Sequence, residues 1–196
     1  MGFVLFGQTD IDELQKYGIK NKAPKGLEIG SKAPDFKVNT IDGLELDLSN
    51  VLDSSNIVLV FFRGSWCPYC TRHIAELMQY KDVFDDRETQ LVFVTPHKEN
   101  YLSDLQEELN KGAYLISDEE LHILEDYDVL FEVNKSYQAK FANAFNQELS
   151  GVNVQDKAVL PVPATYLIGK DGLIKFKHFE YNYTHRSVVG DILKHL

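Results

Sequence analysis

Four apolar runs along the chain have the length and composition of buried strands. Residues 56–62, "NIVLVFF", and residues 89–96, "TQLVFVTP", are almost continuously apolar and rich in β-branched side chains. Runs of this kind are typical of strands that are covered on both faces. The runs "AYLIS" at 113–117 and "ATYLIG" at 164–169 predict two further strands.

Two short turn signals predict hairpins. Asp42-Gly43 separates two extended runs in "FKVNTIDGLELDL", and this dipeptide is a strong short-range hairpin signal. The turn "KDG" lies between "ATYLIG" and the alternating run "LIKFKHF". We therefore expect one hairpin near the N-terminus and a second one near the C-terminus.

Other segments show the spacing of helices. Apolar residues keep helical spacing from Pro68 to Phe84, and a short helix with Thr9 as its cap is expected to end at Gly18. Further helices are predicted at 98–112, from Asp118 to 127 and at 187–196. Residues 132–157 are polar, and Phe141 and Phe145 lie four apart within them, which suggests a helical insertion.

Strands that alternate with helices, followed by a hairpin and a terminal helix, predict an α/β fold. We expect a central mixed β-sheet with helices on both faces and an N-terminal β-hairpin extension. A chain of 196 residues usually forms one compact domain with a core that needs no covalent support.

Charge and hydropathy exclude several classes of function. The formal net charge is -10, so a basic face for nucleic acid or an anionic membrane is not expected. The N-terminus lacks the basic region of a secretory signal, and no run of 18 apolar residues appears. The expected location is the cytoplasm, and the expected partners are small molecules or other proteins.

Both cysteines of the chain lie in "FFRGSWCPYC", where the first strand run gives way to a helix. With Pro68 as the first helical residue, Cys67 lies near the N-cap and Cys70 in the first turn. Unsatisfied N-H groups and the helix dipole stabilise a thiolate there, which lowers the pKa of a cysteine. Reversible dithiol chemistry is the interpretation that this placement favours.

Three other roles for the pair are weaker. A structural disulfide across so short a loop removes little unfolded-state entropy. Structural zinc needs four ligands, and His73 is the nearest further ligand type. Two inert cysteines in the core remain an alternative, because free cysteine often packs as a small apolar residue.

The segments "GSKAPDF", "FFRGSWCPYC" and "PVPATYLIGKDG" together resemble the peroxiredoxin-like proteins of the alkyl hydroperoxide reductase and thiol-specific antioxidant family. The resemblance covers about residues 28–180 and implies a thioredoxin-like fold for 28–196, after an N-terminal helix and loop at 1–27. It also implies that the cysteines lie at the carboxyl end of a central strand. Pro163, after Val162, matches the cis-proline that faces the cysteines in such folds.

The sequence departs from the motif of typical peroxiredoxins, which is Pro-x-x-x-Thr-x-x-Cys. On this chain the proline position holds Arg63, the threonine position holds Cys67, and the peroxidatic cysteine corresponds to Cys70. The later arginine of the family falls at or near Pro163 and is missing. The segments around the site thus resemble a peroxiredoxin, whereas the cysteine pair is of the thioredoxin type.

Two catalytic mechanisms and one non-enzymatic role follow from these departures. In a thiol-disulfide oxidoreductase, Cys67 attacks a substrate disulfide and Cys70 resolves the mixed disulfide. In a thiol peroxidase, peroxide oxidises Cys70 to a sulfenic acid and Cys67 condenses with it. A redox-sensing or binding module that uses the disulfide only as a switch is the third possibility.

The expected partners follow from this chemistry. They are a small peroxide or disulfide substrate and an external reductant of the thioredoxin, glutaredoxin or glutathione type, with no metal or organic cofactor. A homodimer is compatible with the sequence, which leaves the oligomeric state open. Five residues are expected to support the cysteines. Trp66 is expected to lie beside them and Pro163 to face them, while a cation is expected from Arg63, Arg72 or Arg186. Tyr183 is expected to reach the same rim if the return strand of the second hairpin leads back to it.

Overall fold

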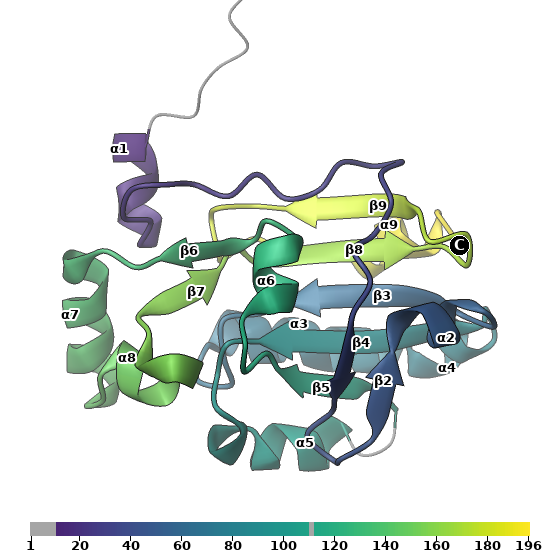
Figure 1. The fold of residues 1–196 in the computed structure, drawn as a ribbon, viewed down its shortest axis with the longest axis horizontal. Helices are drawn as coiled ribbons and strands as arrows, with labels where there is room; N and C mark the ends of the chain where they lie inside the picture. Colours follow the sequence, from purple (N-terminus) through teal and green to yellow (C-terminus); the bar gives the residue numbers. More distant parts are fainter. Residues whose placement is uncertain (1–10, 110–111) are drawn as a thin grey trace, which may run out of the picture.

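A five-stranded mixed sheet forms the centre of the molecule (Figure 1). The computed structural model describes residues 11–109 and 112–196. The strands follow the order β5-β4-β3-β8-β9 across the sheet. β3, β4 and β5 are parallel, whereas β8 is antiparallel to both β3 and β9. Their bounds are Asn56–Phe61 for β3, Thr89–Thr95 for β4, Tyr114–Ser117 for β5, Ala164–Ile168 for β8 and Ile174–Phe179 for β9.

Helices cover both faces of this sheet, as the alternation of the sequence predicts. The side chains of Val58 and Val60 pack toward α3, α4, α5 and α9, whereas those of Ile57 and Leu59 pack toward α2 and α6. Alternate residues of a strand point to opposite faces, so a continuously apolar strand is buried on both. The helices are α2 (Leu48–Leu52), α3 (Pro68–Gln79), α4 (Lys81–Asp85), α5 (Ser103–Leu109), α6 (His122–Asp126) and α9 (Val189–Leu193).

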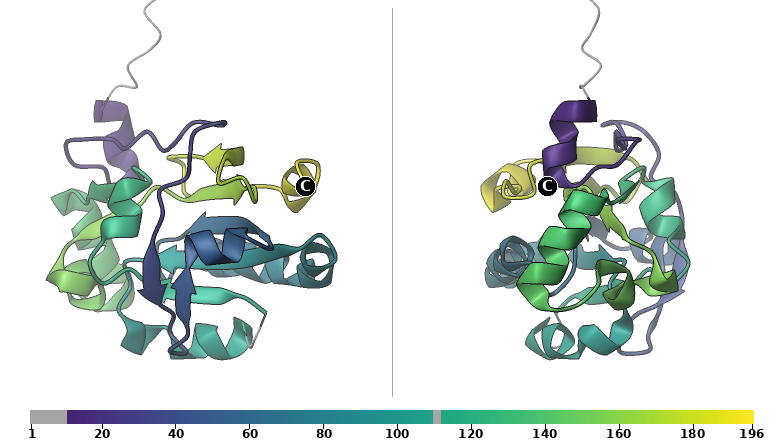
Figure 2. Two further views of the ribbon diagram at one scale, coloured as in Figure 1. Left: turned by 45° about the vertical axis from the view of Figure 1, so that its right-hand side comes forward. Right: turned by 90° about the vertical axis from the view of Figure 1, so that its left-hand side faces the viewer.

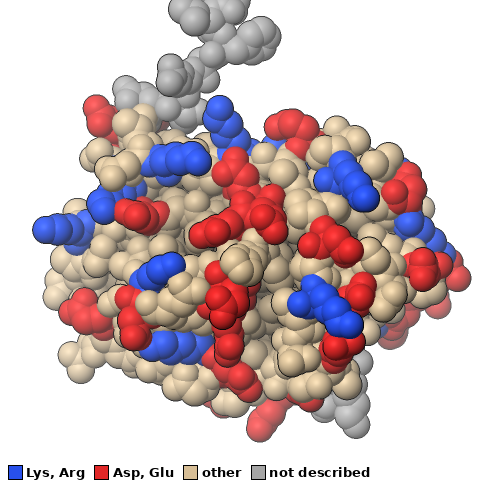
Figure 3. Space-filling model, in the orientation of Figure 1, with Lys and Arg blue, Asp and Glu red and all other residues tan. Residues whose placement is uncertain are grey.

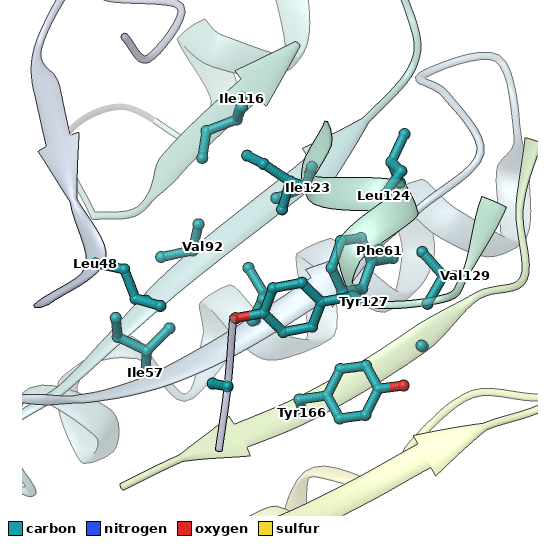
Figure 4. Packing of buried hydrophobic residues seen from close by; sticks show 14 of the residues in the cluster. Leu48, Ile57, Phe61, Val92, Ile116, Ile123, Leu124, Tyr127, Val129 and Tyr166 are labelled. Carbon is teal, nitrogen blue, oxygen red and sulfur yellow. The ribbon is translucent and has the colours of Figure 1, made fainter. Parts of the chain in front are cut away.

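Phe61, Tyr127 and Tyr166 pack together in the core on one face of the sheet (Figure 4), and the two tyrosines bind an N-terminal extended segment. The hydroxyl of Tyr127 donates to the carbonyl of Pro34 at 3.0 Å, and the hydroxyl of Tyr166 accepts from the N-H of Leu27 at 3.0 Å. Both tyrosines are fully buried beside Phe61. Their hydroxyls thus satisfy backbone groups of the segment that crosses the sheet.

The predicted N-terminal hairpin is confirmed. β1 (Lys37–Asn39) and β2 (Glu45–Asp47) pair antiparallel around the turn that contains Gly43. The N-H of Gly43 donates to the carbonyl of Thr40 at 2.9 Å, and this glycine has a φ of 79°. The predicted turn at "KDG" likewise joins the antiparallel strands β8 and β9.

Helical structure occupies most of the polar segment between Glu132 and Lys157 (Figure 2). A two-stranded pair that the sequence patterns did not predict brackets this segment, and a third buried cluster packs beneath the helices. The pair consists of β6 (Leu130–Glu132) and β7 (Val159–Pro161). The helical elements are α7 (Lys135–Phe145), α8 (Leu149–Val152) and η3 (Val154–Asp156).

Several helix boundaries differ from the prediction. α6 begins at His122 rather than Asp118, because Leu121 has a left-handed φ of 63° that ends the preceding turn. The helix from Pro68 stops at Gln79, and Phe84 belongs to α4. The predicted helix at 98–112 consists of η2 (Glu99–Tyr101) and α5, and α9 is shorter than predicted.

The N-terminal helix is a short α1 (Ile11–Leu14) followed by η1 (Gln15–Tyr17). It ends at Gly18, which has a φ of 100°, as the sequence predicts. The proposed cap, Thr9, lies outside the described residues.

Acidic side chains gather near the centre of the face in Figure 3, with lysines and arginines scattered around them. Ion pairs such as Lys177 with Glu28 at 3.0 Å and Lys20 with Glu132 at 2.7 Å join segments far apart in sequence. Within residues 11–109 and 112–196, no helix has both the length and the apolar character needed to cross a membrane.

Candidate active site

The cysteine pair lies where the central strand β3 gives way to α3. Cys67 is the N-cap of α3, with φ −91° and ψ 109°, and Pro68 is its first residue, as predicted. The N-H of Cys70 donates to the carbonyl of Cys67 at 2.9 Å. Proline fits the first helical position because its N-H would be unsatisfied there. The pair is therefore at the carboxyl end of β3, where open α/β sheets place their ligands.

The two thiols are reduced, each only 1% exposed, and their acidities differ. A hydrogen bond with Cys70 lowers the pKa of Cys67 to about 6, and the Arg63 guanidinium favours the same thiolate against the opposing effect of burial. Burial raises the pKa of Cys70 well above its ordinary value, and the hydrogen bond to Cys67 adds to this increase. These opposite shifts favour the state in which Cys67 is the thiolate and Cys70 is the thiol that donates to it.

Arg63 is a buried cation beside the pair, with 2% exposure. Its Nη2 donates to the hydroxyl of Tyr137, and its guanidinium lies 4.0 Å from the ring centroid of Tyr183 and 5.0 Å from that of Trp66. Among the described residues, no carboxylate forms an ion pair with it. A buried charge needs a partner, so the Cys67 thiolate is the anion that compensates Arg63.

Arg186 reaches the other sulfur. Its Nη2 donates to Cys70 Sγ at 3.3 Å, and its Nη1 donates to the backbone carbonyls of Tyr183 and His185. The hydroxyl of the next residue, Ser187, donates to Thr165 Oγ1 at 3.1 Å. This anchor on β8 fixes the segment after β9, so Arg186 and Tyr183 return to the site as the hairpin topology suggests.

His73 lies on the buried face of α3 and contacts the same anchor. Its Nε2 is 3.0 Å from the hydroxyl of Ser187. Burial lowers the pKa of His73 to about 4, and the nearby charge of Arg186 acts in the same direction. Neutral His73 therefore supports the segment that carries Arg186.

Arg72 is exposed on α3, and the acidities of the two thiols respond to Arg63 and Arg186 rather than to it. The structure thus brings two of the three candidate arginines to the sulfurs.

Pro163 precedes β8 at the same end of the sheet, because Ala164 pairs with Phe61 at the end of β3. The prediction of a cis bond before Pro163 is wrong, since no peptide bond of the described residues is cis. The N-H of Val162 donates to the carbonyl of Val129 at 2.8 Å, so the chain runs extended from β7 into β8. A cis-proline is typical of a tight turn, which this path does not contain.

Trp66 is half-buried and packs its ring against α7. Its ring centroid lies 4.8 Å from that of Phe141 and 5.4 Å from that of Phe145. Gly64 makes this position possible, since it has a φ of 145° and a Cβ there would overlap Trp66 Nε1. A side chain at position 64 would displace the tryptophan that precedes Cys67.

Sequence reasoning missed Tyr137, which accepts a hydrogen bond from Arg63, and His97, whose Nδ1 lies 3.3 Å from Ser65 Oγ in the loop before the cysteines. Tyr137 is four residues before Phe141, which is itself four before Phe145, so an aromatic stripe at helical spacing was available as a signal. His97 follows β4, whose carboxyl end meets that of β3. The strand-end rule for parallel sheets was the signal for this residue.

A thioredoxin-like sheet with an activated dithiol at the end of its central strand defines a thiol-dependent oxidoreductase. Residues 29–177 match the model of the AhpC/TSA family, and the chain belongs to this family.

Known proteins similar to this chain include peroxiredoxins and thiol-disulfide oxidoreductases. A Helicobacter pylori (strain J99) protein named as peroxiredoxin bcp is 26% identical over 52% of this chain and 66% of its own length. The thiol-disulfide oxidoreductase ResA of Bacillus thuringiensis (subsp. konkukian, strain 97-27) is 24% identical over 87% of this chain and 79% of its own length. The chain thus spans just under two thirds of the first protein.

Among solved structures, a mutant of PrxQ from Xylella fastidiosa superposes with a TM-score of 0.65 at 14% identity, over 87% of this chain and 94% of that one. This likeness shows the fold.

Proposed function

We propose that this protein is a peroxide-reducing dithiol enzyme in which Cys67 attacks the oxidant and Cys70 resolves the product. The opposite pKa shifts of the two hydrogen-bonded sulfurs carry this proposal, because they make Cys67 the thiolate and Cys70 its proton donor. The thiolate is the nucleophilic form of cysteine. Membership of the AhpC/TSA family supports the same class of chemistry.

The reaction proceeds in two steps. The Cys67 thiolate attacks the terminal oxygen of a hydroperoxide, the O-O bond breaks, and the electron pair leaves on the other oxygen, which takes a proton to form an alcohol or water. Cys67 is then a sulfenic acid. Cys70 loses its proton and attacks the Cys67 sulfur, the S-S bond forms, the S-O bond breaks, and hydroxide leaves as water. The dithiol has supplied two electrons.

Each arginine has a role in this sequence. Arg63 lies beside Cys67 and stabilises negative charge on the attacking thiolate and the departing oxygen. Arg186 donates to Cys70 Sγ, so it stabilises the thiolate that Cys70 must become in the second step.

The size of the oxidant is limited by burial of the sulfurs. With 1% exposure at each cysteine, a hydroperoxide reaches Cys67 more readily than a disulfide on the surface of a folded protein. We therefore place peroxide first among the substrates.

Disulfide exchange is the second candidate, because an N-cap cysteine of low pKa followed by proline and a buried partner suits attack on a disulfide. A peroxidase with Cys70 as the first nucleophile is the third, and the hydrogen bond from Arg186 to Cys70 Sγ favours it.

The Cys67-Cys70 disulfide then needs two electrons from outside the chain. An external thiol of the thioredoxin, glutaredoxin or glutathione type supplies them by exchange, in a reducing compartment such as the cytoplasm. Because both sulfurs are buried in the reduced protein, exchange with a protein thiol requires the segment around the disulfide to open. Neither a homodimer nor a cofactor is needed for this cycle.

The test is oxidation of the reduced protein with one equivalent of hydrogen peroxide, followed by alkylation and mass spectrometry of residues 64–72. We expect the loss of two hydrogen atoms and protection of both cysteines from alkylation, reversed by reduction. Turnover with peroxide, and separately with a small disulfide, in the presence of a thioredoxin system ranks the two substrates. Cysteines that remain alkylatable after peroxide treatment would show that the pair does not cycle.

A further inference from the structure

A cavity of about 220 Å³ lies against Trp66 on the side of α7. Its lining comes from three parts of the chain that are distant in sequence: the loop before α3, the residues after β4, and the helices α7 and α8. Trp66 is bonded to Cys67, so their Cα atoms lie about 3.8 Å apart. Neither cysteine lines the cavity, so it lies beside the residue that precedes the redox pair and does not contain the pair itself.

Most of the residues that line this cavity are aromatic. Phe141 and Phe145 approach the Trp66 ring from α7, and Tyr101 stacks on His97 with ring centroids 5.1 Å apart. Phe145 is 40% exposed, whereas Phe141 is buried, so Phe145 lies at the mouth and Phe141 deeper. Aromatic rings in such edge and offset arrangements form a favourable site for another ring.

His97 gives the cavity one polar atom. Its side chain is buried, with 2% of the residue exposed, and its Nδ1 lies 3.3 Å from Ser65 Oγ. The hydroxyl of Ser65 donates its single hydrogen to the carbonyl of Tyr101 at 2.9 Å. Nδ1 must therefore be the donor to Ser65, which leaves Nε2 as an acceptor.

The acceptor on His97 is free to bind a ligand. Within the part of the chain that the structure describes, no donor forms a hydrogen bond to Nε2. Burial lowers the pKa of His97 to about 4, so the ring is neutral at physiological pH and keeps its lone pair. His97 lines the cavity, so Nε2 is available as an acceptor to a ligand that carries a donor.

The volume limits the ligand to one ring. An apolar cavity of roughly 150 Å³ holds a benzene molecule, so this cavity has room for a six-membered ring with a small substituent.

We propose that this cavity binds a single aromatic ring that carries a hydrogen-bond donor, with the ring between Trp66 and α7 and the donor on His97 Nε2. On the proposed peroxidase function, on which this step rests, the cavity selects oxidants that carry an aryl group. The bound ring holds the oxidant beside Cys67, while hydrogen peroxide gains nothing from the cavity.

Binding is tested on the Cys67→Ser/Cys70→Ser double variant, which has no redox chemistry. The probes are 4-fluorophenol and fluorobenzene, followed by fluorine NMR, together with the indole N-H signal of Trp66, the only tryptophan of the chain. We expect both probes to shift the indole signal, and 4-fluorophenol to bind about fivefold more tightly, as one additional hydrogen bond provides.

Two variants locate the site. Phe145→Ala removes the mouth of the cavity and should weaken both probes, whereas Tyr80→Ala, which removes a similarly exposed aromatic ring (42%) directly after α3, should not. Equal affinity for the two probes would overturn the role of His97. An unchanged Trp66 signal at saturating probe would overturn the site itself.

Substrate selection is measured on the wild-type cysteines. We expect Phe145→Ala to lower, about fivefold, the ratio of kcat/KM for cumene hydroperoxide to that for hydrogen peroxide, and Tyr80→Ala to leave this ratio as it is. An unchanged ratio in Phe145→Ala would overturn the selection. Because binding is measured without the cysteines, failure of the redox cycle and failure of the cavity give different results.

Discussion

The reactivity of Cys67 depends on the hydrogen atom of Cys70 and the charge of Arg63. The sulfur of Cys70 is too buried to ionise easily, so its proton remains available to the neighbouring thiolate. Arg63 is held by aromatic faces and the hydroxyl of Tyr137, none of which neutralises its charge. One sulfur thus becomes the anion and the other its donor.

The Cys67 thiol should ionise at a lower pH than an ordinary cysteine does. With a pKa of about 6, lowered from 9.0, the ultraviolet absorbance of the thiolate should rise as the pH increases through about 6 and level off above neutrality. Cys70→Ala removes the hydrogen-bond donor and should move the midpoint upward. A midpoint at the ordinary cysteine pKa in the unmodified protein would contradict this account.

Arg63→Met should raise the pKa of Cys67, because it removes the compensating cation. Below neutral pH we expect about tenfold slower oxidation by peroxide, the effect of roughly one pKa unit on the thiolate fraction. Arg72→Met is the matched control, since it removes an exposed arginine of α3. Stopped-flow kinetics across pH measure both variants, and equal effects of the two would show that the buried position of Arg63 is unimportant.

At the scale of elements, α7 contacts two residues that lie beside the redox pair, Arg63 and Trp66. Tyr137, Phe141 and Phe145 form one stripe of this helix, which contacts Arg63 at one end and Trp66 at the other. The contacts give the polar segment 132–157 a structural role at the site. We expect this stripe to position Trp66 and Arg63.

Gly64→Ala should disturb this junction. The new Cβ would meet Trp66 Nε1 and would also impose a positive φ on alanine, so we expect a loss of roughly 2–4 kcal/mol in the free energy of unfolding. Gly172→Ala is the control, because Gly172 has a φ of 74° with open space around it and carries only the backbone penalty. Urea unfolding measures both, and equal losses would contradict the contact with Trp66.

Sequence patterns predicted the elements that depend on local periodicity. The strands β3, β4, β5 and β8, the hairpin turns and the start of α3 at Pro68 follow from apolar runs, turn residues and proline placement. The pairing of β6 with β7 joins residues about thirty positions apart and leaves no periodic signal in either short strand. The extended path through Val162 and Pro163 includes the hydrogen bond of Val162 to Val129, a long-range contact that sequence alone does not show.

In the candidate site, too, sequence predicted the features that depend on local pattern and missed those that depend on long-range contacts. The roles of Cys67 and Cys70 could be argued from their position at a helix start. The contact of Arg186 with Cys70 was only one possibility of the topology, and Tyr137 was missed because its partner Arg63 is 74 residues away. Contacts between residues so far apart in the sequence are set by packing between elements rather than by local pattern.

At the scale of the whole molecule, the buried titratable groups set the pH dependence of stability. Burial lowers the pKa values of His73 and His97 from 6.5 to about 4, and raises the pKa of Asp118 from 3.8 to about 6. Between pH 6.5 and 4 the unfolded chain binds protons on both histidines that the folded chain does not, so stability falls as the pH falls. Asp118 has the opposite effect on stability, because between pH 6 and 3.8 the folded chain binds a proton on this residue that the unfolded chain does not.

The two histidines should outweigh the single aspartate. Each shift of this size corresponds to roughly 3 kcal/mol, so we expect a net loss of about 3 kcal/mol on acidification from pH 7 to 4. Asp118→Asn keeps an acceptor for the N-H of Leu124 but loses the opposing titration, so its stability should fall more steeply. Urea unfolding at several pH values measures both, and a flat profile for the unmodified protein would contradict the burial of neutral histidines.

The order of attack by the two sulfurs is the central claim, and trapping of the sulfenic acid tests it most directly. Cys70→Ser and Cys67→Ser are each treated with one equivalent of hydrogen peroxide and a sulfenic-acid probe at neutral pH, and the labelled residue is identified by mass spectrometry. We predict rapid labelling of Cys67 in Cys70→Ser and little labelling of Cys70 in Cys67→Ser. Rapid labelling of Cys70 in Cys67→Ser, with none on Cys67 in Cys70→Ser, would contradict the account and make Cys70 the peroxidatic residue.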